Sequence, residues 1–165
     1  MVKERAGMDC VSLREIADED LPIFFEQMTN PAACHMAAFT CKDPRDHAAF
    51  LGWFTRVRGD PQIVACTVVC EGVVVGQVLS CPREDRREIC YWFGQAYWGR
   101  GVATAAVAAY LKRVSGRPIY ARAARDNMAS IRVLEKCGFL LEGRDRGFAN
   151  ARGEEIDEVV MVLSA

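Results

Sequence analysis

The sequence has no excess of charge of either sign and no apolar run long enough to cross a membrane. Its 165 residues carry 21 Lys and Arg against 22 Asp and Glu, a formal net charge of -1. This balance excludes a general electrostatic footprint for a nucleic-acid backbone or an anionic membrane surface, although it leaves room for a local basic patch. The longest apolar helical stretch, residues 102–111, is far shorter than the ~20 residues of a membrane span. Residues 1–6 lead into no apolar segment of the kind found in secretory signals. We therefore expect a cytoplasmic protein without nucleic-acid or membrane partners.

The sequence also lacks a C-x-x-C pair, although it contains eight cysteines. Zinc sites generally need two close pairs of ligands, and only Cys34-His35 with Cys41 comes near that spacing. We therefore expect no metal. Several cysteines, such as Cys66 and Cys90, stand in apolar runs, where a thiol behaves as a small buried hydrophobic group. The prediction is that the cysteines are reduced thiols.

Several catalytic and nucleotide-binding motifs are missing as well. There are two histidines and no G-x-S-x-G turn, which argues against a Ser–His–Asp hydrolase. A Walker A motif is absent, and a G-x-G-x-x-G fingerprint beginning at Gly99 fails because Thr104 stands where glycine or alanine is needed. These classes of enzyme are excluded.

The composition is that of a globular protein, with 51% hydrophobic and 26% charged residues. The length predicts one domain over residues 1–165. Hydrophobic periodicity predicts strands over 11–16, 63–70, 73–80, 87–93, 119–123, 139–141 and 156–163, and helices over 18–28, 46–58, 102–114 and 127–137. Glu71-Gly72 is a two-residue hairpin turn, Asn30-Pro31 ends the first helix, and residues 32–42 are expected to form a loop or a short helical turn. The order predicts an α+β, mixed-sheet fold.

The most informative segment covers residues 91–104, where a strand leads through a glycine-containing turn into a helix. Gly99 and Gly101 allow the backbone to approach a ligand closely, and the free N–H groups of a first helical turn attract a phosphate. The alternative interpretation is a tight turn that needs glycine only for its dihedral angles. The segment by itself favours neither interpretation.

Two motifs together resemble a known family. Residues 97–104, YWGRGVAT, are similar to the pyrophosphate-binding motif Q/R-x-x-G-x-G/A of the GNAT superfamily of N-acetyltransferases, except that Ala96 holds the leading position and Gln95 lies one residue early. Residues 127–139, NMASIRVLEKCGF, are similar to the second hallmark of that superfamily, an N-x-x-S helix that ends in K-x-G-F. The form of the first motif is most like the branch that contains the ribosomal-protein N-terminal acetyltransferases.

The resemblance implies a fold and a cosubstrate. The fold is a central, mostly antiparallel, twisted sheet of about seven strands, splayed at the cofactor site and flanked by about four helices. Acetyl-CoA, without a metal, would lie against strand 87–93, with a backbone N–H near Trp92 or Phe93 polarising the thioester and Asn127 bonding the pantetheine arm. The remaining cofactor-binding residues implied are Trp98, Gly99, Arg100, Gly101, Ala103 and Thr104.

The resemblance also implies direct attack by a primary amine on the thioester. Glu88 is the candidate general base, and the alternative interpretations are an exposed strand carboxylate or a partner for Arg86. Ser130 is the candidate group that protonates or stabilises the leaving sulfur, and an early-helix residue is its alternative. Asn127 is expected to cap the helix as well as to bind the cofactor. Tyr120 is a remote candidate for the acid.

The amine acceptor has no motif of its own in the sequence. In the family that it resembles, residues 32–42 help to form the acceptor site, but for His35, Met36, Phe39 and Trp53 a structural role is the first expectation. The arginines of residues 144–152 are expected in a solvated turn. The prediction is an acetyl-CoA-dependent N-acetyltransferase acting on a protein N-terminus or a small amine, with a homodimer allowed by resemblance. The alternative is a non-catalytic acyl-CoA-binding or regulatory domain.

Overall fold

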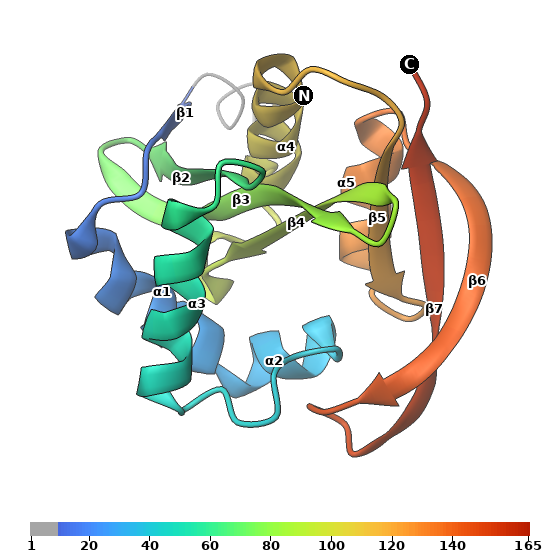
Figure 1. Cartoon of the computed structure of the whole chain (residues 1–165), viewed down its shortest axis with the longest axis horizontal. Helices are drawn as coiled ribbons and strands as arrows, with labels where there is room; N and C mark the ends of the chain where they lie inside the picture. Colours follow the sequence, from blue (N-terminus) through green and yellow to red (C-terminus); the bar gives the residue numbers. More distant parts are fainter. Residues whose placement is uncertain (1–9) are drawn as a thin grey trace.

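A single twisted sheet of seven strands runs through the computed structural model, which describes residues 10–165 (Figure 1). The strand order is β1-β2-β3-β4-β5-β7-β6, and every neighbouring pair is antiparallel except β4 and β5. The mostly antiparallel sheet predicted from the family resemblance is therefore confirmed. The strands are β1 (Val11–Arg14), β2 (Val64–Cys70), β3 (Val73–Arg83), β4 (Arg86–Phe93), β5 (Ile119–Ala124), β6 (Leu140–Ala149) and β7 (Glu154–Leu163).

Helices cover both faces of the sheet. On one face Phe24 and Phe54, from two different helices, pack against Leu79 of β3. On the other face Tyr110 and Leu134 join the larger core, which includes the inner residues of β2 to β5. The helices are α1 (Leu21–Thr29), α2 (Pro31–Ala37), α3 (His47–Gly59), α4 (Val102–Arg113) and α5 (Met128–Lys136). None of these helices, which all lie within residues 10–165, is long and apolar enough to span a membrane.

Helix α2 occupies most of the segment for which a loop or a short helical turn was expected. Asn30 and Pro31 do end α1, but they also start the next helix. The side chain of Asn30 accepts a hydrogen bond from the amide of Ala33, and Pro31 stands at the first helical position, where the missing N–H costs nothing. The expectation failed because an Asn-Pro pair serves equally as a stop signal and as a start signal.

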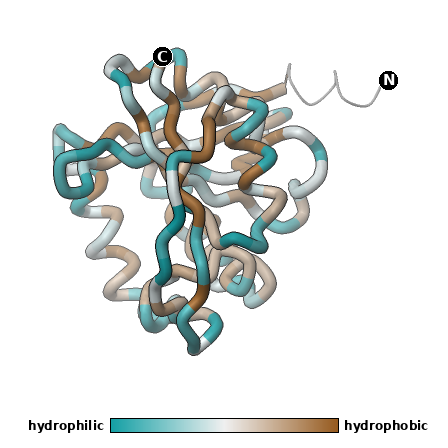
Figure 2. The backbone as a smooth tube through the Cα atoms, turned by 90° about the vertical axis from the view of Figure 1, so that its right-hand side faces the viewer, coloured by the Kyte–Doolittle hydropathy of each residue, from teal (hydrophilic) through white to brown (hydrophobic). Residues whose placement is uncertain are grey.

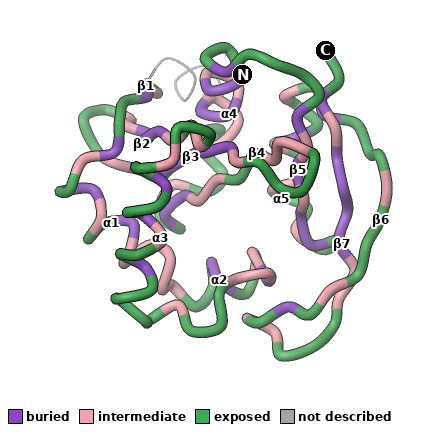
Figure 3. Tube along the Cα trace, in the orientation of Figure 1, coloured by how far each residue is buried: buried purple, intermediate pink, exposed green. Residues whose placement is uncertain are grey.

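The β6–β7 hairpin is longer than the sequence predicted. A strand was expected over 139–141 and a solvated turn over 144–152, but β6 continues to Ala149. Nearly all of β6 is exposed, whereas β7 is buried along much of its length (Figure 3). Figure 2, which faces this hairpin, shows extended hydrophilic stretches along it. An exposed edge strand carries little alternation of apolar and polar residues, so its periodicity is weak.

Strands β4 and β5 separate after a single point of pairing. Their recorded register contains only Glu88 opposite Tyr120, so β4 continues toward Phe93 without a partner on that edge. On its other edge β4 stays close to β3, where a Cβ added to Gly76 would clash with the carbonyl oxygen of Trp92. The predicted splay of the sheet is therefore present, and glycine is required beside it.

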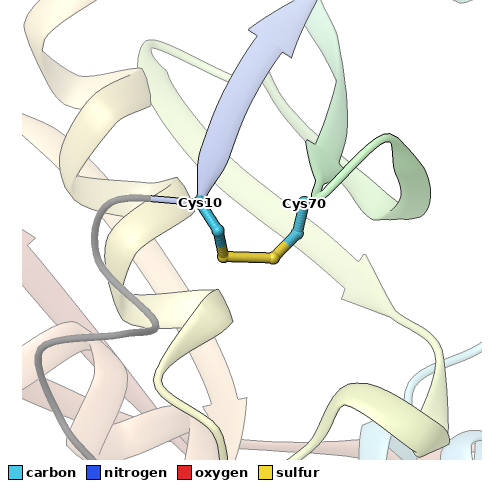
Figure 4. Close-up of a disulfide and its surroundings, with 2 residues drawn as sticks. All are labelled: Cys10 and Cys70. Carbon is cyan, nitrogen blue, oxygen red and sulfur yellow. A yellow bond between two sulfur atoms is a disulfide. The ribbon is translucent and has the colours of Figure 1, made fainter.

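A disulfide joins the start of β1 to the end of β2. Cys10 and Cys70 form a disulfide with a Cα–Cα distance of 4.9 Å (Figure 4). The prediction that the cysteines are reduced thiols is wrong for this pair. It failed because residues 60 positions apart meet only when β1 pairs with β2, which sequence spacing does not reveal. The remaining six cysteines are free thiols. Cys66 is buried as expected, whereas the expectation is wrong for Cys90, which is exposed.

Candidate active site

A cavity of about 760 Å³ lies where β4 separates from β5, between α2, the start of α4 and the start of α5. We call residues 93–104 and 127–136 the cofactor wall. We call α2, the β6–β7 turn and residues 125–126 the acceptor wall, of which only α2 contributes to the cavity lining. The cavity brings together all the predicted cofactor-binding residues and Ser130. These are Trp92, Phe93, Trp98, Gly99, Arg100, Gly101, Ala103, Thr104, Asn127 and Ser130.

The turn into α4 has the geometry of an anion-binding site. Gly99 and Gly101 have φ angles of +72° and +78°, which a residue with a Cβ adopts only with strain. A Cβ added at either position would meet no atom within 4 Å, so open space lies in front of the turn. The amides of Val102, Ala103 and Thr104, in the first turn of the helix, have no intrahelical carbonyl partner. The amide of Trp98 is different, because it donates to Gln95 within the turn at 3.2 Å.

The charges that line the cavity are all positive. Arg100, Arg132 and Lys136 are part of the lining, which includes no carboxylate. None of these three side chains forms an ion pair with a carboxylate of residues 10–165. Arg132 and Lys136 were not predicted from the sequence as binding residues. Their spacing of four residues on one helix face was the signal that could have identified them.

At the end of β4, the backbone N–H and C=O groups of Phe93 face the gap between β4 and β5. The amide of Gly94 donates to Val75 of β3 at 3.0 Å. Since N–H groups alternate along a strand, the amide of Phe93 points away from β3 and into the splay. The Phe93 carbonyl also points there and accepts a hydrogen bond from the Trp98 indole at 3.1 Å. Of the two predicted positions, Phe93 is therefore the one with a backbone donor toward the cavity. The Trp92 side chain instead binds the carbonyl of Gln27, linking β4 to α1.

Asn127 and Ser130 lie in the first turn of α5. The side chain of Asn127 accepts a hydrogen bond from the amide of Ser130 at 3.3 Å, as a helix-capping residue does. The Ser130 hydroxyl is not used for capping, because its oxygen lies 2.7 Å from the hydroxyl of Tyr91 on β4. Burial raises the pKa of Tyr91 to about 12, so the phenol is protonated at neutral pH.

Glu88 lies on the opposite face of β4 from Tyr91 and is not part of the cavity lining. Its carboxylate accepts hydrogen bonds from Arg122 at 2.8 Å and from Arg83 at 3.2 Å. The alternative partner suggested by the sequence, Arg86, is wrong, because Arg86 binds Glu142. Arg122 also contacts the carboxylates of Glu158 at 2.9 Å and Asp145 at 3.1 Å. Glu88 therefore belongs to a charge cluster beside the cavity, and any proton that it takes from the cavity would pass through water.

Arg152 holds the acceptor wall together. Its guanidinium donates to both oxygens of Asp126, at 2.5 and 2.9 Å, and to the carbonyl of His35 at 3.0 Å. The side chain is only 9% exposed, so the expectation of a solvated turn is wrong for this arginine. Arg152 also holds the pKa of Asp126 below its ordinary range. The contact joins the β6–β7 turn to α2 and to the residue before Asn127.

The other residues considered for the acceptor site have different positions. Met36 lines the cavity, whereas Phe39 packs with Ala124 and Trp53 packs against the core between α1 and α3. Tyr120 stacks on Arg86, 4.3 Å from the guanidinium carbon, and does not line the cavity. The remote acid predicted at Tyr120 is thus placed away from this site.

The family of the chain follows from a sequence comparison. Residues 11–140 match the model of the acetyltransferase (GNAT) domain. This match covers most of the chain, so the protein belongs to the GNAT acetyltransferase family and is an N-acetyltransferase by class. No curated protein matches this chain in sequence.

Solved structures with the same fold include several N-acetyltransferases. One is Mycobacterium smegmatis RimJ in complex with CoA-disulfide, with a TM-score of 0.76 and 22% identity, covering 94% of this chain and 82% of RimJ. Another is RimL, a ribosomal L7/L12 alpha-N-protein acetyltransferase in complex with CoA, with a TM-score of 0.73 and 19% identity, covering 94% of each chain. A third is the spermidine N-acetyltransferase of Vibrio cholerae in complex with CoA and spermine, with a TM-score of 0.80 and 18% identity, covering 94% of this chain and 96% of that one. Because these sequence identities are 22% or lower, the structural similarity establishes the shared fold alone.

Proposed function

We propose that this protein transfers an acetyl group from acetyl-CoA to a primary amine, acting as one cytoplasmic domain. The observation that carries the proposal is the cofactor wall, where a left-handed glycine turn, a helix N-terminus and three unpaired cationic side chains surround one cavity. A ligand that carries several phosphates fits this arrangement. The complexes of the structural neighbours with CoA support the same choice.

The cofactor wall would hold the pyrophosphate at the turn that contains Gly99 and Gly101. The amides of Val102 to Thr104 would donate to its oxygens, while Arg100 adds a charge-assisted contact. Arg132 and Lys136 would lie within reach of the remaining phosphate charge. Asn127 is already oriented by its capping bond and would present its amide nitrogen to the pantetheine arm. The amide of Trp98, already bonded to Gln95, would contribute least.

The chemistry needs few protein groups, because an amine attacks a thioester directly. The amide of Phe93 would donate to the thioester carbonyl, on which negative charge develops. Ser130 would donate to the sulfur as the C–S bond breaks. An amine with a pKa near 8 must lose a proton before it attacks, and Glu88 is the candidate that accepts it through water.

The acceptor is proposed to be a protein N-terminus or a small-molecule amine. RimL acts on a ribosomal protein, and the Vibrio cholerae enzyme was solved with spermine. The acceptor wall of this protein contributes Met36 and the residues around it to the cavity. The apolar Met36 side chain suits an acceptor whose amine reaches the thioester and whose adjoining segment is uncharged.

The test is a measurement of CoA thiol release with a panel of amines that includes N-terminal peptides and polyamines. Turnover with at least one acceptor and thermal stabilisation by acetyl-CoA are expected. Stabilisation by CoA without turnover would favour the non-catalytic acyl-CoA-binding alternative. The absence of both would contradict the proposed function.

A further inference from the structure

Tyr91 of β4 and Ser130 of the cofactor wall form a pair of hydroxyl groups, and the proposed function uses only Ser130. Both residues line the cavity. Their hydroxyl oxygens are 2.7 Å apart, and the second oxygen near the phenol, the carbonyl of Ser130, is at 3.4 Å. The pair therefore joins the splayed end of β4 to the first turn of α5.

The direction of the hydrogen bond follows from the chemistry of the two groups. A phenol is a stronger hydrogen-bond donor than an aliphatic alcohol, and both acceptors within reach of the Tyr91 proton belong to Ser130. The geometry allows either hydroxyl to donate, and on these grounds we assign Tyr91 as the donor and the Ser130 oxygen as the acceptor. Since that oxygen accepts a hydrogen bond on one side, the hydroxyl proton of Ser130 is directed elsewhere, and the cavity is open to it.

The surroundings keep the pair neutral. Burial raises the pKa of Tyr91 to about 12. The thiol of Cys137 interacts with the phenol, and desolvation raises the pKa of this thiol as well. At neutral pH the phenol and this thiol are therefore protonated.

We propose that Tyr91 is a positioning residue that orients the Ser130 hydroxyl as a hydrogen-bond donor to the sulfur of CoA. The inference rests on the proposed function. In the transfer step the amine nitrogen forms the new C–N bond and loses one proton to water. The C–S bond breaks and the sulfur keeps its electron pair. Ser130 donates to the negative charge that develops on this sulfur, and the bond from Tyr91 strengthens that donation.

The first experiment is a double-mutant cycle on kcat, with the affinity for CoA measured in parallel. Ser130→Ala is expected to lower kcat about 100-fold, as loss of a donor to a developing charge does. Tyr91→Phe keeps the ring and is expected to lower kcat about 10-fold without a change in KM for acetyl-CoA. The double variant is expected to be no slower than Ser130→Ala alone. Losses that multiply, or a Tyr91→Phe enzyme as fast as wild type, would overturn the inference.

Tyr120→Phe is the matched control. It removes a phenolic hydroxyl group from β5, the strand next to β4, at a position outside the cavity lining. Its kcat and KM are expected to match those of wild type. Thermal unfolding of each variant separates a loss of folding from a loss of rate.

The second experiment needs no acceptor, so it distinguishes failure of the inference from failure of the proposed function. The thiol of bound CoA is titrated by its thiolate absorbance, with the S-methyl-CoA complex as the reference that cannot ionise. The pKa of the bound thiol is expected to fall by about 1 in wild type and to return toward the free value in both Tyr91→Phe and Ser130→Ala. A wild-type protein that binds CoA without that fall, or a Tyr91→Phe protein that retains it, would contradict the inference alone. Failure of wild type to bind CoA would contradict the proposed function and the inference with it.

Discussion

The cofactor wall and the acceptor wall border the same cavity but are assembled in different ways. The cofactor wall comes from two short stretches of sequence, and its turn is shaped by backbone conformation, with Gly99 and Gly101 in the left-handed region. The acceptor wall depends on side chains that meet across the chain. Arg152 binds a carbonyl 117 residues away, and Asn150 binds one 110 residues away. Local sequence therefore specifies the first wall, and the tertiary fold specifies the second.

This difference predicts separable effects. A change in the cofactor wall is expected to alter CoA affinity whatever the acceptor. A change in the acceptor wall, or in the charge cluster around Arg122, is expected to alter acetyl transfer while CoA affinity is kept. The following predictions test that separation, from the largest effect to the smallest.

Gly101→Asp is expected to abolish CoA binding. The φ angle of +78° makes any side chain strained there, and a carboxylate would face the phosphates. The loss is expected to exceed about 100-fold in Kd, measured by calorimetry. Gly116→Asp is the matched control, because Gly116 has a φ angle of +92° but lies outside the cavity lining. It is expected to lose stability and to keep its CoA affinity. Unchanged CoA affinity in Gly101→Asp would contradict the placement of the phosphates.

Glu88→Gln is expected to lower kcat/KM for the amine about 100-fold, the usual scale for a general base. The Kd of CoA is expected to stay the same, since Glu88 is not part of the lining. Glu142→Gln, which changes the exposed partner of Arg86, is the control with no expected effect on rate. If the Glu88→Gln enzyme kept its rate, the role of Glu88 would be limited to its ion pairs with Arg122 and Arg83.

Asp126→Asn is expected to raise KM for the amine about 10-fold by loosening the contact between Arg152 and the acceptor wall.

The same substitution should also change the stability of the folded protein at acid pH. Because Arg152 lowers the pKa of Asp126, the folded state gains stability above the ordinary pKa, and this gain is lost as the pH falls below about 4. Asp126→Asn should lack that pH-dependent component in urea unfolding. Asp157→Asn, which changes another exposed ion pair of the hairpin, is the control. An unchanged KM would mean that the acceptor wall does not depend on Arg152.

Arg132→Ala and Lys136→Ala are expected to weaken CoA binding about 3-fold each. Both side chains line the cavity without a carboxylate partner, so their contribution should shrink as salt is raised. Calorimetry at low and high ionic strength measures this effect. Lys112→Ala, on α4 outside the lining, should leave the affinity unchanged. If Arg132→Ala and Lys136→Ala bound CoA as tightly as Lys112→Ala does, neither Arg132 nor Lys136 would contribute to CoA binding.

The success of sequence reasoning differs between the two walls for a physical reason. A glycine turn before a helix and an Asn–Ser helix start are local features, so their residues could be named before the structure was seen. The Asn30-Pro31 pair was understood only as the end of one helix, because nothing local shows that α2 will pack against the β6–β7 hairpin. Arg152 was placed in solvent because its partners, Asp126 and His35, are distant in sequence.

By itself the sequence determined the order of most elements, the family and the composition of the cofactor wall. These depend on hydrophobic periodicity, helix capping and the conformational freedom of glycine, which act over a few residues. Only the tertiary structure decided that Cys10 meets Cys70, that Glu88 pairs with Arg122, and that Tyr91 meets Ser130. Each of these contacts joins separate elements, and strand register and helix packing set the distance between their side chains.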